Sequence, residues 1–429
     1  MSHKSFELDE ITKIEGHSKL SVKIDNDQVK DVRLEVFESS RFFESITKGR
    51  KYYECSALTQ RICGICSFIH TITSLKAMEN ILGIALTDDM KKLRELFLIS
   101  GQIHSHVVHL YFMSLPEYLG YDDVIEMSEK RHEEIHRALR LKACASEVGN
   151  IIGGRLIQPV TPWFGGFWSV PTRERLEHIL DTFQSAKKDA RKLVQLTSRI
   201  KVPDFQTDNQ FFSLKKEGDY QLYEGEIVSI DNIGFEPNDY LKHVQEFVKD
   251  YSTAKRSYIN KRPAMVGALA RLNINYEYLS DEVKKLLKKS RIKIPSYNPY
   301  HNNFAQAVEV MHFINRAIDL TEDLLTSDLS ASKIKTKSRR GRGIAVCEAP
   351  RGLLIHDYTT DQEGLIKKTN VITPTAFNLT SIEQDLKRLL TQIIDLPKEE
   401  MISQSEKLIR AYDPCISCAT HFLELEIKK

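Results

Sequence analysis

Two stretches of sequence, one near each end of the chain, decide how it folds. They are Arg61-Ile-Cys63-Gly-Ile-Cys66-Ser-Phe-Ile-His70 and Tyr412-Asp413-Pro414-Cys415-Ile-Ser-Cys418-Ala-Thr-His421. In each, two residues separate two cysteines, a spacing that lets both sulfurs face one ion. Pro414 has no N–H and disfavours helical geometry in the residue before it, so the second pair is predicted on a turn beyond a helix end.

Spacing alone leaves four interpretations of these pairs, one of which is that the two pairs are unrelated. Zinc ribbons keep their cysteine pairs within a few tens of residues, whereas here 415 − 66 = 349 residues separate them. A thioredoxin-like redox pair needs a βαβ context, which neither motif has. A buried metal site of four thiolates is favoured over both, and also over two unrelated pairs. Soft thiolates suit zinc, nickel or iron, so the spacing does not choose the metal.

Composition and charge narrow the class of protein. The chain has 429 residues, with 61 Lys plus Arg against 59 Asp plus Glu and a formal net charge of +2. That balance argues against nucleic acid as a partner. The N-terminus lacks the apolar segment of a signal peptide and no apolar run is long enough to span a bilayer, so we expect a cytoplasmic protein. Seven cysteines, an odd number, do not indicate a disulfide framework.

The hydrophobic pattern predicts a mainly helical fold with small β additions (α+β). Apolar and polar residues alternate on both sides of a turn, which predicts a β-hairpin over residues 18–37. No linker or repeat divides the chain, so we expect residues 1–429 to form one domain, a helical bundle with this hairpin at its N-terminus. Helical spacing recurs in segments 93–110, 176–183, 303–325 and 382–411.

Two local signals add detail. Ser381 and Gln384 have the spacing of a capping box, which predicts a helix start at this point. The basic run from Lys333 to Arg342 is predicted to be a solvated loop, with a phosphate-bearing or acidic partner as the less favoured alternative.

With their flanks, the two cysteine motifs resemble the two signatures of nickel–iron hydrogenase large subunits, the catalytic subunits of those enzymes. The matches run from residue 13 to 421 in family order, so the resemblance covers essentially the whole chain. The short tail and the stretch from Arg351 to His356 look like the cytoplasmic multi-subunit branch (group 3), linked to NAD(P), a deazaflavin or a heterodisulfide reductase. The other matching segments are Lys13-Ile-Glu15-Gly-His17, Arg41-Phe-Phe-Glu44, Glu348-Ala-Pro350-Arg351-Gly352 and Ile372-Thr-Pro374-Thr375-Ala-Phe-Asn378.

The resemblance implies a nickel–iron centre on the four cysteines. Cys63 and Cys415 would be terminal ligands of nickel. Cys66 and Cys418 would bridge nickel to an iron that carries carbon monoxide and cyanide. Four thiolates would neutralise much of the charge of such a centre.

The resemblance also implies roles for residues around the metals. Arg351 would lie beside the diatomic ligands of iron, and Thr375 would donate a hydrogen bond to a cyanide. Pro350, Pro374 and His70 are expected at the same cofactor. Taken alone, Arg351 would be interpreted as a salt-bridge partner and His70 as a core histidine.

Two further roles follow from the same resemblance. Glu15 would pass protons between a terminal cysteine and the surface, although alone it would be interpreted as a surface carboxylate. A magnesium ion would be bound by Glu44, His421 and the main-chain carbonyl near Ile372. Oxygen-rich ligation suits that ion.

The implied reaction is the reversible heterolytic cleavage of dihydrogen, with Cys415 as the thiolate that takes the proton. The cysteines left over, Cys55, Cys144 and Cys347, are too few for a four-cysteine iron–sulfur cluster. We therefore expect an iron–sulfur small subunit, together with further electron-transfer subunits, as partners. The family's precursors are cut after the last motif histidine, so nickel-insertion proteins and a maturation protease that removes residues 422–429 are expected as well.

Two alternatives are weighed against this hypothesis. The stretch from His132 to His136 matches the HExxH pattern of zinc proteases, but its charged flanks predict a solvated helix. A non-catalytic homologue in respiratory complexes resembles the family without its cysteines, and all four are present here. The chain departs from the uptake enzymes at Ser105, where they have aspartate, and at Gln158, where many members have histidine.

Overall fold

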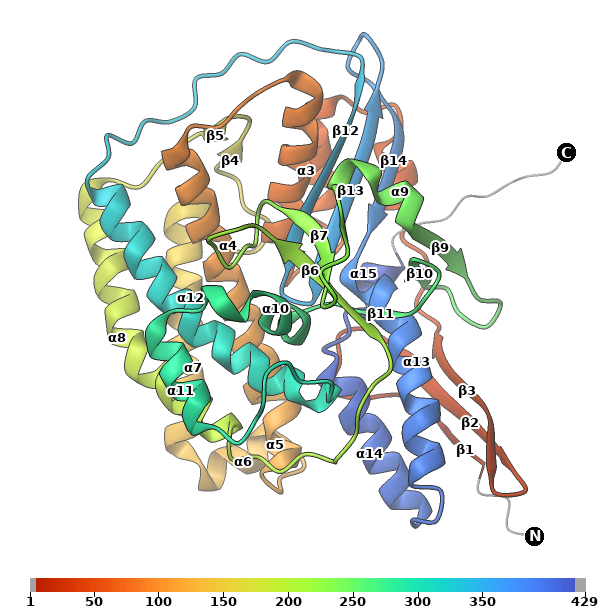
Figure 1. The fold of residues 1–429 in the computed structure, drawn as a ribbon. Helices are drawn as coiled ribbons and strands as arrows, with labels where there is room; N and C mark the ends of the chain where they lie inside the picture. The colour runs from red at the N-terminus through yellow and green to blue at the C-terminus, as the bar shows by residue number, and fades with distance from the viewer. Residues whose placement is uncertain (1–4, 421–429) are drawn as a thin grey trace, which may run out of the picture.

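The computed structural model describes residues 5–420, and a layer of long helices forms one side of it (Figure 1). Residues 302–315 of the helix α12 are entirely buried, because α12 packs against both α4 and α8. Thr172 caps α8 by accepting a hydrogen bond from the main-chain N–H of Arg175. The helices of this layer are α4 (Asp88–Val108), α7 (His132–Gly153), α8 (Arg173–Thr197) and α12 (Asn302–Leu325).

Beside this layer, the helix α3 (Ser67–Leu82) packs against a three-stranded antiparallel sheet in the order β12-β13-β14. In the β12–β13 hairpin, Ala349 pairs with Gly352, so Pro350 and Arg351 alone form the turn. Gly352 has a φ of 124°, and a Cβ there would lie 2.4 Å from a methyl group of Val266, so only glycine fits. The strands are β12 (Gly341–Ala349), β13 (Gly352–Thr360) and β14 (Ile366–Ile372).

The N-terminal segment forms a second antiparallel sheet, β1 (Phe6–Leu8), β2 (Ser18–Asp25) and β3 (Gln28–Val36). It packs on α13 (Pro374–Gln392). Arg256 and Glu383 form a buried ion pair at 2.8 Å, and both hydrogen-bond the main chain of Leu34 in β3. The N-terminal sheet is thereby fixed to the C-terminal third of the chain.

Smaller elements complete the chain. One mixed sheet has the order β11-β6-β7-β8, and two pairs are β9–β10 and β4–β5. Their strands are β4 (Pro162–Trp163), β5 (Gly166–Phe167), β6 (Gln210–Lys215), β7 (Glu226–Ser229), β8 (Gly234–Phe235), β9 (Val244–Val248), β10 (Lys255–Ile259) and β11 (Ala264–Met265). The shorter helices are α1 (Phe43–Thr47), α2 (Cys55–Thr59), α5 (Leu115–Tyr118), α6 (Val124–Lys130), α9 (Tyr240–His243), α10 (Ala268–Asn275), α11 (Asp281–Lys289), α14 (Lys398–Ala411) and α15 (Ile416–Ala419).

These elements confirm the predicted α+β fold, including the hairpin over 18–37 and the helical segments 93–110, 176–183 and 303–325. The predicted helical segment 382–411 is divided, because α13 ends at Gln392 and α14 begins at Lys398. The basic run before β12 carries neither helix nor strand up to Arg340. The capping box at Ser381 is wrong. Pro374 begins α13 seven residues earlier, and Ser381 is buried in its middle. Among the described residues, no helix is both long and apolar enough to cross a membrane.

Candidate metal centre

Both cysteines of the first pair lie where the chain enters α3. Cys66 directly precedes the helix, and its main-chain N–H points to the sulfur of Cys63 at 3.4 Å. The side chains of both residues are buried. The entry to a helix leaves main-chain N–H groups without intrahelical partners, which favours a negatively charged sulfur there.

The second pair lies on the turn that the sequence predicts. α14 ends at Ala411, Asp413 has a left-handed φ of 52°, and Cys415 stands immediately before the short helix α15. The sulfur of Cys415 lies 2.9 Å from that of Cys418 and 3.4 Å from that of Cys63. The predicted turn is confirmed.

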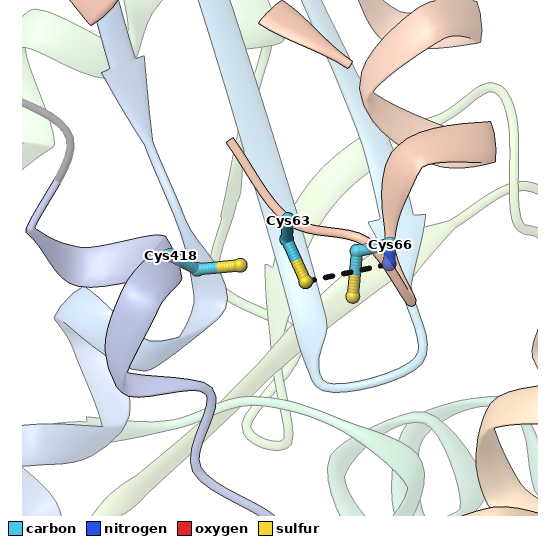
Figure 2. Close-up of side chains that lie close together, drawn as sticks. All are labelled: Cys63, Cys66 and Cys418. Carbon is cyan, nitrogen blue, oxygen red and sulfur yellow. Dashed lines mark hydrogen bonds between the residues drawn. The ribbon is translucent and has the colours of Figure 1, made fainter. Parts of the chain in front are cut away.

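All four sulfurs therefore gather in one buried pocket. The thiols of Cys63, Cys66 and Cys418 lie within 4.8 Å of one another. Figure 2 shows these three side chains pointing toward one space, two from the entry to α3 and one from α15. A soft, four-sulfur donor set of this kind fits nickel and iron. Within residues 5–420 it is the one group of at least three such side chains that could hold a metal ion.

The surroundings shift the pKa values of Cys66 and Cys415 in opposite directions. Hydrogen bonds with the thiols of Cys415 and Cys418, aided by the charge of Arg351, hold the pKa of Cys66 well below its usual range. Burial raises the pKa of Cys415 well above its usual range. Four thiolates cannot share so small a space without a cation, and a metal supplies one.

Arg351 reaches this pocket from the tip of the β12–β13 hairpin. Its Nη1 donates to the sulfur of Cys66 at 3.3 Å and to the hydroxyl of Ser105 at 3.4 Å. Its Nη2 forms an ion pair with Asp413 at 2.8 Å, and its Nε donates to the Asp413 carbonyl at 2.7 Å. Asp413 thus fixes the guanidinium beside the sulfurs. The sequence motif contained Asp413, but no local pattern showed that Arg351 was its partner.

Glu15 reaches the opposite side of the pocket. Its Oε2 lies 3.1 Å from the sulfur of Cys415 and accepts the main-chain N–H of Ser417 at 3.0 Å. Its own carbonyl accepts the N–H of Ile416 at 2.9 Å, a bridge between the two ends of the chain. The approach needs Gly16, since a Cβ there would lie 2.7 Å from the Cβ of Ile416. The structure therefore places Glu15 in contact with a predicted nickel ligand.

Sequence reasoning missed a second carboxylate on this side. Ser417 donates its hydroxyl to Oε1 of Glu38 at 3.3 Å, while Oε2 of Glu38 is buried without a hydrogen-bond partner among the described residues. Glu38 follows the end of β3 and had no motif to mark it. His17, in the same motif as Glu15, is exposed and contacts Glu10 at 2.8 Å instead.

The other predicted cofactor residues lie around the two pairs. The hydroxyl oxygen of Thr375 accepts the main-chain N–H of Cys415 at 3.0 Å. Pro374 is the first residue of α13, and the carbonyl of Pro350 accepts from Arg271 at 3.0 Å. The main-chain N–H of His70 donates to the carbonyl of Cys66 at 3.2 Å. Their predicted contacts with a cofactor stay predictions.

Glu44, the first predicted magnesium ligand, lies in α1 next to the ammonium of Lys255. Its Oε1 lies 3.0 Å from Lys255 Nζ and accepts the main-chain N–H of Val371 at 2.7 Å. The same ammonium lies 2.8 Å from Glu246 Oε1 and 2.9 Å from Asn370 Oδ1. This oxygen cluster is of a kind that suits a hard cation, and Lys255 lies within it.

Of the other two predicted magnesium ligands, the structure describes only Ile372. Ile372 is the last residue of β14 and is buried. His421 lies outside the described residues.

The positions of the two histidines argue against the zinc-protease alternative. His132 and His136 are both exposed at the start of α7, and neither belongs to a possible metal group in the described part of the chain. The leftover cysteines are scattered as expected: Cys55, Cys144 and Cys347 are buried and free, and none joins the pocket.

Comparison with known proteins agrees with this geometry. The family model described as nickel-dependent hydrogenase matches residues 41–170 and 173–421, and one described as HoxL-like matches 6–39. The alpha subunit of sulfhydrogenase 2 from Pyrococcus furiosus is 36% identical over 420 residues, covering 98% of this chain and 99% of that protein. The matching chain of the F420-non-reducing hydrogenase from Methanothermobacter thermautotrophicus is 30% identical, with 98% and 95% covered. A crystal structure of an NAD+-reducing [NiFe]-hydrogenase in the H2-reduced state has a TM-score of 0.88 at 25% identity, with 97% and 99% covered.

Proposed function

This chain belongs to the nickel-dependent hydrogenase large subunits, and from that premise we propose how its own residues serve the reversible cleavage of dihydrogen. It is the catalytic subunit of an oxidoreductase that acts on hydrogen. The observation that carries the proposal is the convergence of four buried sulfurs from opposite ends of the chain.

Nickel and iron are the metals of this family, and the cysteines would hold them. We assign Cys63 and Cys415 as terminal ligands of nickel, and Cys66 and Cys418 as ligands shared with iron. When bound, the metals supply the Lewis acid that polarises dihydrogen and takes up its electrons. Arg351 and Thr375 would donate to the carbon monoxide and cyanide of the iron, which orients and tunes a metal centre.

The proton leaves on the side of Glu15. Cys415 is the base, and Oε2 of Glu15 stands within hydrogen-bonding reach of its sulfur. The main-chain N–H of Ser417 holds that oxygen in place, and the Ser417 hydroxyl contacts Glu38. We therefore propose the order Cys415, Glu15, Glu38 for proton exit.

Electrons leave through a partner, because this chain has no second group of cysteines in its described part. We propose that an iron–sulfur small subunit docks on the segment 155–168, and that further electron-transfer subunits extend the path. Exposed Ile157, Val160 and Trp168 lie on this segment. Its Gln158 donates its main-chain N–H to the hydroxyl of Ser67, which directly follows Cys66. One hydrogen bond thus links this segment to the residue next to a predicted metal ligand.

Copurification tests this docking face. Val160→Glu is expected to abolish copurification with the small subunit, because a charge would be buried in the interface. Ile233→Glu is the matched control, since Ile233 is 62% exposed on a different turn. An intact complex with Val160→Glu would place the partner elsewhere.

We propose that a magnesium ion binds at the oxygen cluster of Glu44 in the metal-loaded enzyme. Glu44, Glu246 and Asn370 supply the hard oxygen donors, and the ion and the Lys255 ammonium are alternative partners for the two carboxylates. Metal analysis should find about one magnesium per chain in the parent and a loss in Glu44→Gln. Lys261→Gln, outside the cluster, should retain it.

We also propose that residues 422–429 are removed by a maturation protease after nickel insertion. Intact mass of active protein should lack the eight residues 422–429 of the sequence, and nickel-starved protein should keep them. Active, nickel-loaded protein with its tail intact would show that this chain matures differently.

Metal content together with activity tests the whole proposal. The purified enzyme should contain nickel and iron and reduce a dye with dihydrogen. A properly matured chain without nickel would instead fit the non-catalytic homologue.

A further inference from the structure

A cavity of about 670 Å³ between α8 and α11 is lined by basic side chains, and no carboxylate lines it. It opens at the C-terminal ends of both helices. Its cations are Arg199, Lys201, Lys289, Arg291 and Lys293. All five side chains are exposed.

None of these five cations forms an ion pair with another residue of the range 5–420. At the opposite end of α11 the arrangement differs, since Glu282 pairs with both Lys187 and Arg191 of α8. One carboxylate thus pairs with the cations at one end of the α8–α11 contact, whereas none lines the cavity at the other end. Like charges that line one cavity repel each other, and a bound anion reduces that repulsion.

The favourable interaction of cations with helix C-termini explains only some of these five basic residues. Lys289 lies in the last turn of α11, where the helix carbonyls favour a cation. That turn is already closed, because the N–H of Ser290 donates to the carbonyls of Leu286 and Leu287. Arg291, Lys293 and Lys201 lie beyond both helices, so the helix dipole does not explain them.

The size and lining of the cavity indicate the class of ligand. Val194, Ile200, Leu286 and Ile292 give it apolar walls, and His301 and Ser290 add polar groups. Its volume is that of a small-molecule site rather than of a protein interface. Guanidinium and ammonium groups together recognise phosphate oxygens, the arginines through paired donors. We propose that this cavity binds an anion with several linked phosphates, either a free polyphosphate or the phosphate chain of a nucleoside triphosphate.

Binding of inorganic tripolyphosphate to the purified hydrogenase complex tests the proposal. Isothermal titration should show saturable binding that weakens with added salt. The double variant Arg291→Gln/Lys293→Gln should weaken it by at least about tenfold, because two charge-assisted contacts are lost. The matched control is Lys335→Gln/Lys337→Gln, which removes the same charge from the exposed basic loop and should leave binding within about twofold.

A parallel titration with adenosine triphosphate distinguishes a free polyphosphate from a nucleoside triphosphate as the ligand. Equal affinity for both probes assigns the phosphate chain as the ligand, and tighter binding of the nucleotide assigns a nucleoside triphosphate. The proposal is overturned if tripolyphosphate and the nucleotide both fail to bind the parent complex, or if the cavity variant binds them like the parent. Equal weakening by both double variants overturns it too, since that shows general attraction to a basic surface. Because both variants are surface changes, dye reduction should stay at the parent rate.

Discussion

The two cysteine pairs share one pocket but have opposite electrostatic neighbours. In the first pair, Cys66 lies 3.3 Å from the guanidinium of Arg351. In the second, Cys415 lies 3.1 Å from the carboxylate of Glu15. A guanidinium keeps its charge and stabilises a thiolate, whereas a carboxylate can accept a proton and release it. Identical spacing in sequence is thus accompanied by a charge-holding guanidinium on one side and by a carboxylate, the proposed proton acceptor, on the other.

Removing one cysteine ligand from either pair should destroy the whole metal site. Cys415→Ser and Cys63→Ser are expected to lower dihydrogen-dependent dye reduction by more than about 10³-fold and to lower nickel content, because a soft ligand is lost. Cys144→Ser is the control, as a buried cysteine outside the pocket. Full activity with normal nickel in either ligand variant would sink the assignment.

Glu15→Gln should impair proton transfer without loss of the metals. It keeps the shape of the side chain and removes the exchangeable acid, so activity should fall by about 10²- to 10⁴-fold while nickel is retained. Hydrogen–deuterium exchange with water measures the loss directly. Glu10→Gln, which alters only an exposed partner of His17, should exchange like the parent. If the Glu15 variant also exchanges at the parent rate, protons leave by another route.

Arg351→Lys should weaken the charge-holding side. Lysine keeps the charge but loses the fork that contacts Asp413 and Cys66 together, so dye reduction should fall by about 10- to 100-fold. Arg342→Lys is the matched control, because Arg342 pairs with Asp357 at the far end of β12. An unaffected Arg351→Lys enzyme would show that charge alone suffices beside Cys66.

Glu38→Gln should have the smallest effect, about two- to fivefold, because Glu38 stands one step farther from the sulfur than Glu15. The solvent isotope effect on dihydrogen oxidation should rise in this variant. Glu35→Gln, whose carboxylate accepts from Ser21, is the control. Identical isotope effects in both variants would remove Glu38 from the route.

The sequence predicted what short-range patterns encode. The CxxC spacings, the proline before Cys415 and the alternation over 18–37 each specify local geometry, and the structure confirms them. The family resemblance placed Arg351 and Glu15 near the cysteines, which spacing could not do. The capping-box spacing at Ser381 failed because burial against β3 and β10 continues through that point, so tertiary packing overrides the local signal.

Partners distant in sequence could not be predicted. Asp413 holds Arg351 from 62 residues away, and Lys255 meets Glu44 from 211 residues away. Neither pair has a spacing rule, because the fold alone brings them together. The single-domain expectation and the roles of Pro350, Pro374 and His70 stay predictions.

The bridge between Glu15 and Cys415 has a consequence for how the protein is made. Cys66 leaves the ribosome 349 residues before Cys415. At roughly 5–20 residues per second, that interval is about 17 to 70 s. During this interval the nascent chain can offer a metal only Cys63 and Cys66, two of the four sulfurs of the centre. The four-sulfur centre therefore cannot be completed before Cys415 and Cys418 have left the ribosome, and until then Cys63 and Cys66 are open to other thiophilic metals such as zinc.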